Sequence, residues 1–125
     1  MRENNLSGVI IGCAMRVHTA LGPGLLESAY EECLDYELKK AGLDVGKQIP
    51  LPLVYQDVKL ECVYRLDLIV ENQIIVEIKS VESLHPIHSV QLLTYLKLAN
   101  CKLGLLLNFN VLHLKEGIKR VANNL

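Results

Sequence analysis

Apolar positions in the first forty residues recur at the spacing of an α-helix. They do so from Ser7 to about Ala20, and Ser7 is a residue type that caps helix N-termini. Gly-Pro-Gly at 22–24 interrupts this pattern. A second helix is predicted from about Pro23 to Lys40, because proline is favourable at the first position of a helix. Its expected core residues are Leu26, Ala29, Tyr30, Cys33, Leu34, Leu38 and Ala41.

The pattern then changes to one typical of a β-hairpin. Apolar runs at 58–70 and 74–80 flank the polar residues 71–73. We expect a three-residue loop in which Asn72 or Gln73 adopts the left-handed conformation.

Shorter segments complete the predicted order of elements. Residues 47–56 indicate an edge or bulged strand, because two prolines within them cannot donate to a sheet. A helix is predicted over 86–99, a strand buried on both sides over 102–109, and a terminal strand and turn over 111–114 and 118–121. A strand–helix–strand unit implies a parallel pair with a right-handed crossover. The expected fold is therefore α/β, with a mixed sheet flanked by helices.

Three charged residues, Asp67, Glu77 and Lys79, lie within the hairpin where a buried strand would favour apolar residues. We expect Asp67 to lie opposite Glu77, because a slip by one residue would mix charges into both faces. Opposed Cβ atoms lie about 4.5–5.5 Å apart, so the two carboxylates could hold a small cation such as Mg²⁺. A surface hairpin with a cross-strand salt bridge is the alternative. In the expected register, the other face consists of Leu66, Leu68, Val70, Ile74, Val76 and Ile78.

Length and composition bound the function. The chain has 125 residues, which fits one domain over 1–125, and 50% are hydrophobic. No apolar run is long enough to span a membrane, and the polar N-terminus lacks a signal-peptide core, so a cytoplasmic location is expected. A net charge of −1 argues against binding nucleic acid through bulk charge. The four cysteines, at 13, 33, 62 and 101, form no Cys-x-x-Cys pair and are expected to be reduced core residues.

Several segments together resemble a known family. Residues 24–30, Gly-Leu-Leu-Glu-Ser-Ala-Tyr, resemble the motif that names the GxxExxY proteins. These belong to the PD-(D/E)xK nuclease superfamily, whose restriction-endonuclease-like core is αβββαβ. Asp67 and then Glu77-Ile78-Lys79 resemble the metal and catalytic signature of that superfamily. Gln91 to Tyr95 resembles the Q-x-x-x-Y element of its RecB-like branch. The resemblance covers about residues 9–119, and Leu66 stands where the superfamily's name has Pro.

The resemblance implies a role for each candidate residue. Asp67, Glu77 and the main-chain carbonyl of Ile78 would ligate Mg²⁺ (or Mn²⁺). Glu27 would bind the ion directly or through water, although its position alone indicates only a favourable acid in a first helical turn. Lys79 would position the attacking water or stabilise charge on the phosphate.

Two further residues, Gln91 and Tyr95, would help to position the site or contact backbone phosphate. Without the resemblance, their spacing with His88 indicates only a solvated or half-buried helix face. The expected function is an Mg²⁺-dependent phosphodiesterase acting on DNA or RNA. The alternative is a catalytically silent nuclease-fold binding module or a partner-dependent subunit in nucleic-acid metabolism, and a homodimer or a protein partner is left open.

Overall fold

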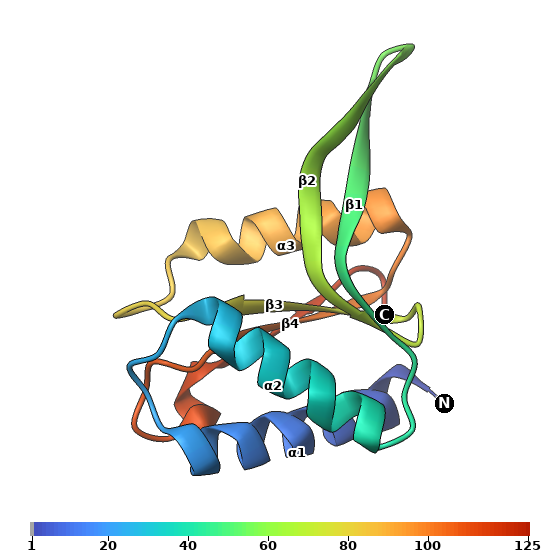
Figure 1. Ribbon diagram of the computed structural model, residues 1–125. Coiled ribbons are helices and arrows are strands. Elements are labelled where there is room, and N and C mark those ends of the chain that lie inside the picture. Colours follow the sequence, from blue (N-terminus) through green and yellow to red (C-terminus); the bar gives the residue numbers. More distant parts are fainter. Residues whose placement is uncertain (1) are drawn as a thin grey trace.

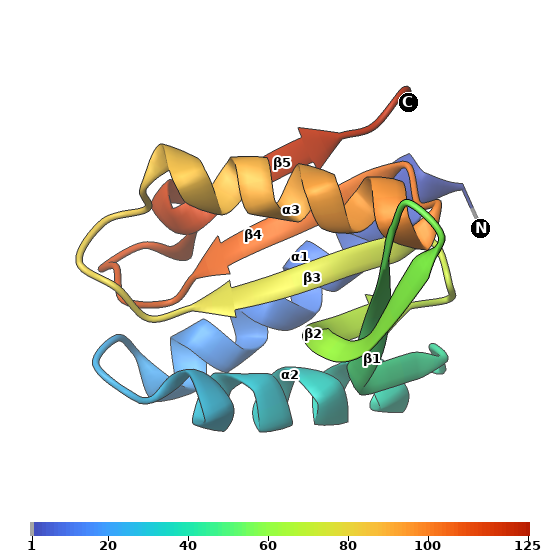
Figure 2. The same cartoon turned by 90° about the horizontal axis from the view of Figure 1, so that it is seen from above.

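A five-stranded sheet lies between two layers of helices in the computed structural model (Figures 1 and 2). The structure describes residues 2–125, except for the side chains of residues 61–63. The strands follow one another across the sheet in chain order, and only the β3–β4 pair is parallel. The elements are α1 (Glu3–Leu21), α2 (Glu27–Lys40), β1 (Val45–Tyr55), β2 (Val58–Val70), β3 (Ile74–Lys79), α3 (Pro86–Ala99), β4 (Leu103–Asn108), the 3₁₀ turn η1 (Leu114–Gly117) and β5 (Ile118–Ala122).

The two faces of the sheet are covered by different helices. Helices α1 and α2 pack on one face, where Tyr30 stacks on Phe109 with ring centroids 4.5 Å apart. Helix α3 covers the opposite face (Figure 1). It approaches β4 closely because position 104 is glycine: a Cβ there would lie 2.9 Å from atoms of Leu92. Every residue of β4 is buried, which confirms the strand that was predicted to be covered on both sides.

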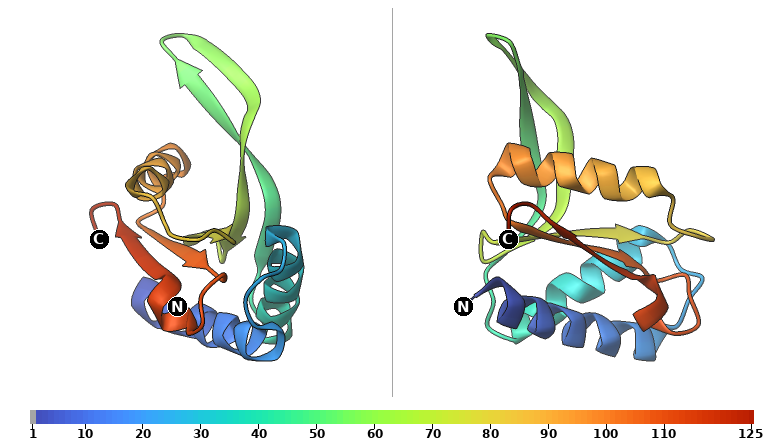
Figure 3. Two further views of the ribbon diagram at one scale, coloured as in Figure 1. Left: turned by 90° about the vertical axis from the view of Figure 1, so that its left-hand side faces the viewer. Right: turned by 180° about the vertical axis from the view of Figure 1, so that it is seen from behind.

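The β1–β2 hairpin extends well beyond the sheet. Strand β2 pairs with β3 only through Leu68–Val70, whereas it pairs with β1 along most of its length. The outer part of this hairpin, residues 49–66, projects past α3 (Figure 3), and we call it the arm. Strand β1 is an edge strand with a register shift between Leu51 and Leu53, as its two prolines predicted.

The hairpin between β2 and β3 has the predicted register. Ile69 lies opposite Ile75, and residues 71–73 form the loop. Asn72 is left-handed as expected, with φ 53°, but the second left-handed residue is Glu71, with φ 54°, and Gln73 is not. Glu71 is held there by two contacts with Asp44: its N–H donates to the Asp44 carbonyl, and its carboxylate accepts the Asp44 N–H.

Both N-terminal helix starts were predicted wrongly. Helix α1 begins at Glu3, because its apolar stripe starts with the buried Leu6, four residues before Ile10. Ser7 lies inside the helix, where its hydroxyl donates to the carbonyl of Asn4. The α1 N-cap, Arg2, makes no side-chain capping bond.

Helix α2 begins at Glu27 and not at Pro23, because Gly22 and Gly24 have φ of 69° and 97°, outside the helical region. Leu26 is consequently 77% exposed and not a core residue. Ala41, also expected in the core, is exposed at the C-cap of α2.

Three further expectations need correction or completion. Leu66 was expected on the same apolar face as Leu68 and Val70, but it packs instead on the side of the sheet that α3 covers, with Leu92 and Tyr95, because β2 leaves the sheet at this point. Residues 111–114 do not form a strand. Cys13 and Cys101 are buried and Cys33 is half-buried, all three as free thiols, whereas the side chain of Cys62 lies outside the described set. No described helix is long and apolar enough to cross a membrane.

Candidate functional site

Two carboxylates, Asp67 of β2 and Glu77 of β3, lie where these strands separate. The last regular pair of their ladder is Leu68 with Val76. Beyond this pair, side-chain carboxylates accept the backbone N–H groups. The Asp67 N–H donates to Oε2 of Glu77, and the Ile78 N–H donates to Oδ2 of Asp67, both at 2.9 Å. The register predicted from the apolar pattern therefore does bring these two acids together.

The surroundings of this pair disfavour two negative charges. Glu77 is only 7% exposed, and burial together with the charge of Asp67 raises the pKa of Glu77 to about 8. Burial also raises the pKa of Asp67, although the Ile78 N–H and the charge of Lys79 act in the opposite direction. The ion pairs among the described side chains all lie elsewhere, at Arg16–Glu37, Lys39–Asp35 and Lys47–Glu32.

Helix α2 brings two more carboxylates to the same region. Glu27, its first residue, accepts the N–H of Ser80 through Oε2 at 3.2 Å. Glu31 lies one turn further on, and burial raises its pKa. Gln48 of β1 joins α2 to β2, because its Nε2 lies 2.8 Å from Oε1 of Glu31 and 3.4 Å from Oδ1 of Asp67.

Sequence reasoning did not identify Glu31 or Gln48. Glu31 could have been found from its spacing, since it follows Glu27 by four residues and so shares a helix face with it. Gln48 carries no such signal. Its backbone φ of 52° is unusual within a strand and becomes visible only in the structure.

Lys79 ends β3 beside helix α3. With Gln91 and Tyr95 of α3 it lines one groove of about 590 Å³, so the structure places these three predicted residues around a common space. Tyr95 is buried, and its pKa is raised first by burial and then by the negative charges of Glu77, Tyr64 and Asp67. Gln91 is exposed on the same helix.

Asp67, Glu77, Glu27 and Glu31 all present carboxylate oxygens, the ligands that a hard divalent cation prefers. The Asp67 N–H contacts the Glu77 carboxylate, and the raised pKa of each acid means that its charged form is disfavoured, which a bound cation would offset. The arrangement is incomplete, however. Across residues 2–125, apart from the side chains of 61–63, no three His, Cys, Asp or Glu side chains form a ready metal-binding group. Glu27 is instead held by Ser80.

Comparison with known proteins agrees with this fold. The family model of the PD-(D/E)XK nuclease superfamily matches residues 4–121. The chain therefore belongs to the PD-(D/E)XK nuclease superfamily, and its mixed sheet between helices is the restriction-endonuclease-like fold. Nucleases of this superfamily generally use divalent metal ions. A search of curated proteins and a search of solved structures each gave no match.

Proposed function

We propose that the protein is a metal-dependent phosphodiesterase that cleaves DNA or RNA. The observation that carries this proposal is the contact between the half-buried Asp67 and the buried Glu77, with Lys79 two residues further along β3. Two adjacent carboxylates of raised pKa are costly for a fold unless they serve a ligand or a reaction. Membership of a nuclease superfamily supports a divalent ion as that ligand and phosphodiester hydrolysis as that reaction.

In this proposal Asp67, Glu77 and the Ile78 carbonyl hold Mg²⁺ or Mn²⁺, with Glu27 binding directly or through water. The ion supplies an activated water and polarises the phosphoryl oxygen. Lys79 positions that water or stabilises the charge that develops on the phosphate.

Other residues of the site bind the substrate or orient the metal ligands. Gln91 and Tyr95 contact the backbone phosphate of the substrate. Gln48 and Glu31 orient Asp67, because Gln48 contacts both carboxylates and fixes Asp67 relative to α2.

The finer family assignment, a GxxExxY protein of the RecB-like branch, is part of the same proposal. Each residue that the GxxExxY motif specifies has a structural role that supports this assignment. Gly24 takes a left-handed conformation, and Glu27 begins α2. The Tyr30 hydroxyl donates to the Gly22 carbonyl at 2.6 Å and accepts the Leu25 N–H, which ties down the loop that presents Glu27.

A second candidate function is a catalytically silent binding module or a subunit that depends on a partner. The lack of a ready metal-binding group among the described side chains favours it, and so does the net charge of −1. In this case the nuclease fold would be retained while a partner or the substrate supplies the missing ligands.

Cleavage of labelled single- and double-stranded DNA and RNA tests the proposal. With Mg²⁺ or Mn²⁺ the wild type should cut at least one of these substrates, and EDTA should stop it. Lys79→Ala should lose most of the activity, whereas Lys97→Ala, an exposed lysine of α3, should not. Absence of metal-dependent cleavage in every substrate, or full activity of Lys79→Ala, would contradict it.

A further inference from the structure

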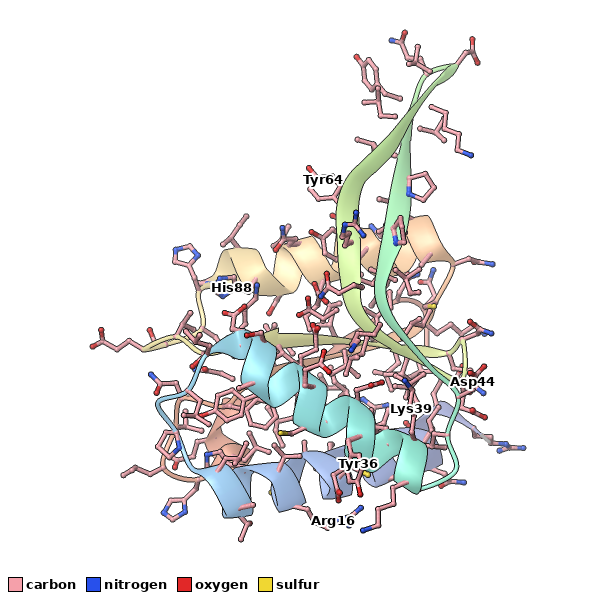
Figure 4. All side chains as sticks on the ribbon, viewed as in Figure 1. Arg16, Tyr36, Lys39, Asp44, Tyr64 and His88 are labelled. Carbon is pink, nitrogen blue, oxygen red and sulfur yellow. The ribbon has the colours of Figure 1, made fainter. Side chains whose placement is uncertain are left out.

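The groove that contains Lys79 continues along the arm. Its described lining comes from both α3 and the hairpin and includes Leu53, Tyr64, Lys79, His88, Gln91 and Tyr95. Figure 4 places Tyr64 on the hairpin above α3, and His88 near the N-terminal end of that helix. The groove thus joins the candidate catalytic residues to a surface that the proposed chemistry does not require.

The lining of the groove combines polar and apolar side chains. It offers a lysine, a histidine and an amide, and most of the remaining lining is apolar or aromatic, from Leu53, Tyr64, Ile87, Val90 and Leu98. No acidic residue is among the described lining. A ligand with an anionic end and a flat apolar end would match this arrangement, and a nucleotide has both.

Tyr64 is suited to hold a base. Its ring packs against that of the buried Tyr95, with centroids 5.6 Å apart and planes inclined at 49°. Tyr64 nevertheless remains 38% exposed, so part of its ring is available to a ligand. The contact with Tyr95 fixes the ring in advance and reduces the ordering that binding requires.

His88 adds a polar donor at the other end. Its Nδ1 accepts the N–H of His85 at 3.1 Å, a bond of the α3 capping box. In the neutral imidazole the proton then resides on Nε2, which can donate to a phosphate oxygen.

We propose that this groove binds single-stranded nucleic acid, with an unpaired base stacked on Tyr64 next to the phosphate held at Lys79. The inference rests on the proposed function and specifies its substrate class. A base must leave its duplex partner before it can enter a groove and stack on a side chain. A volume of about 590 Å³ lies within the range of small-ligand sites, roughly 300–1,000 Å³, and suits a single nucleotide. DNA and RNA share the base and phosphate on which the argument depends.

Binding without cleavage tests this assignment. Fluorescence anisotropy in EDTA would compare one short labelled sequence as single-stranded DNA, single-stranded RNA and duplex DNA. Wild type should bind at least one single strand several-fold more tightly than the duplex. Tyr64→Ala should weaken that binding about five- to 150-fold, the range found for base–aromatic stacking, while Tyr64→Phe should keep most of it.

Tyr36→Ala is the matched control. This tyrosine of α2 is 64% exposed and lines a different groove, between α1 and α2 (Figure 4), so its loss should leave binding unchanged. A fluorescent adenine analogue in the strand should be quenched by wild type and by Tyr64→Phe, and much less by Tyr64→Ala. Melting temperatures of the three variants would show that each one is folded.

The outcomes separate this inference from the proposed function. Single-strand binding that depends on Tyr64, in a protein that cuts nothing with any metal, would support the groove and contradict the phosphodiesterase. The protein could also cleave nucleic acid while its binding is unaffected by Tyr64→Ala, or while it binds duplex as tightly as single strands. Either result would overturn the proposal of single-strand binding in the groove and leave the proposed phosphodiesterase activity intact. No binding to any of the strands would also overturn the groove.

Discussion

Glu77 combines deep burial with a neighbouring carboxylate, and this combination makes the stability of the metal-free protein sensitive to pH. In the folded state its pKa is about 8, compared with an ordinary value of 4.5. Between these two values the unfolded chain holds fewer protons than the folded one, so the free energy of unfolding falls as the pH rises. The contribution is fully present below about pH 4.5 and is lost as the pH passes about 8.

We therefore predict that, in EDTA, the free energy of unfolding decreases by a few kcal/mol between pH 5 and pH 8, at up to about 1.4 kcal/mol per pH unit. Glu77→Gln should remove most of this slope, because an amide does not titrate. The variant should still fold, because the amide oxygen can accept the Asp67 N–H. Denaturant unfolding at several pH values measures it. Glu116→Gln, at an exposed position of η1, is the control. A slope that is the same in Glu77→Gln and wild type would contradict the assignment to Glu77.

Asp67 gives a second prediction, for metal binding. Asp67→Asn should leave the melting temperature in EDTA unchanged or higher, because it removes a charge that repels Glu77 while Asn can still accept the Ile78 N–H. Wild type should be stabilised by Mg²⁺ or Mn²⁺, by about 2.7 kcal/mol at a hundred times the dissociation constant. Asp67→Asn should lose most of that gain. Thermal unfolding with and without metal measures both, and equal shifts in the two proteins would mean that the ion binds elsewhere.

At the scale of elements, Asn108 connects β4 to the segment that follows Lys79. Its Nδ2 donates to the Val81 carbonyl at 2.9 Å, and its Oδ1 accepts the N–H groups of Val81 and Asn110. The Phe109 N–H also donates to the Lys79 carbonyl. Because Asn108 is 2% exposed, water cannot readily replace these bonds.

Asn108→Ala should therefore cost about 1–3 kcal/mol, the penalty for leaving buried polar groups unsatisfied. The same variant should lower cleavage under conditions where it is fully folded, because the end of β3 loses its anchor. Denaturant unfolding and cleavage rates measure the two effects. Asn123→Ala, another side chain that donates to a backbone carbonyl but near the C-terminus, should leave cleavage unchanged. Unaltered stability of Asn108→Ala would show that these bonds contribute little.

Most elements could be predicted because their signals are local. The bounds of β2 and α3, and the register at Ile69, follow from apolar patterning and from proline at a helix start. The start of α2 could not be predicted, because the preference of proline for a first helical turn competes with the left-handed glycines beside it. Leu66 was misplaced because the bend of β2 away from the sheet depends on contacts with α3 that no single segment reveals.

The same distinction holds for the site. Asp67 and Glu77 could be paired from the sequence because they lie on one hairpin, and the structure confirms their contact. Glu31 and Gln48 join the site through the packing of α2 against β1, a contact between segments with separate local patterns. The spacing of Glu31 from Glu27 shows only that the two share a helix face, and the contact of Gln48 with both Glu31 and Asp67 becomes visible only in three dimensions.

At the scale of the whole molecule, a net charge of −1 limits how nucleic acid can be bound. In the groove, Lys79 and His88 are the only basic residues among the described lining. We predict that binding depends only weakly on salt. The logarithm of the association constant should fall against the logarithm of the salt concentration with a slope of magnitude below about 3, because each neutralised phosphate contributes about 0.7–0.9. Anisotropy titrations across a range of salt concentrations measure the slope. A much steeper slope would mean that an extended basic surface outside the groove binds the substrate.

The arm and the catalytic region together suggest how a small domain can bind substrate without bulk positive charge. The arm projects past α3 (Figure 3), and its Tyr64 lines the same groove as Lys79, where we propose that a base stacks. Contacts with bases would then supply affinity that phosphate contacts do not, and they are less sensitive to salt. The low net charge is therefore compatible with the proposed nuclease function.

The most direct test of the central claim is the single-turnover cleavage rate of a labelled oligonucleotide as Mg²⁺ is titrated. The substrate is whichever strand wild type cuts in the assay proposed above. The account predicts a rate that rises with Mg²⁺ to a plateau and vanishes in EDTA, and at least a hundredfold lower rates in folded Asp67→Asn and Glu77→Gln. Equal rates in these variants and wild type, or cleavage that persists in EDTA, would contradict it.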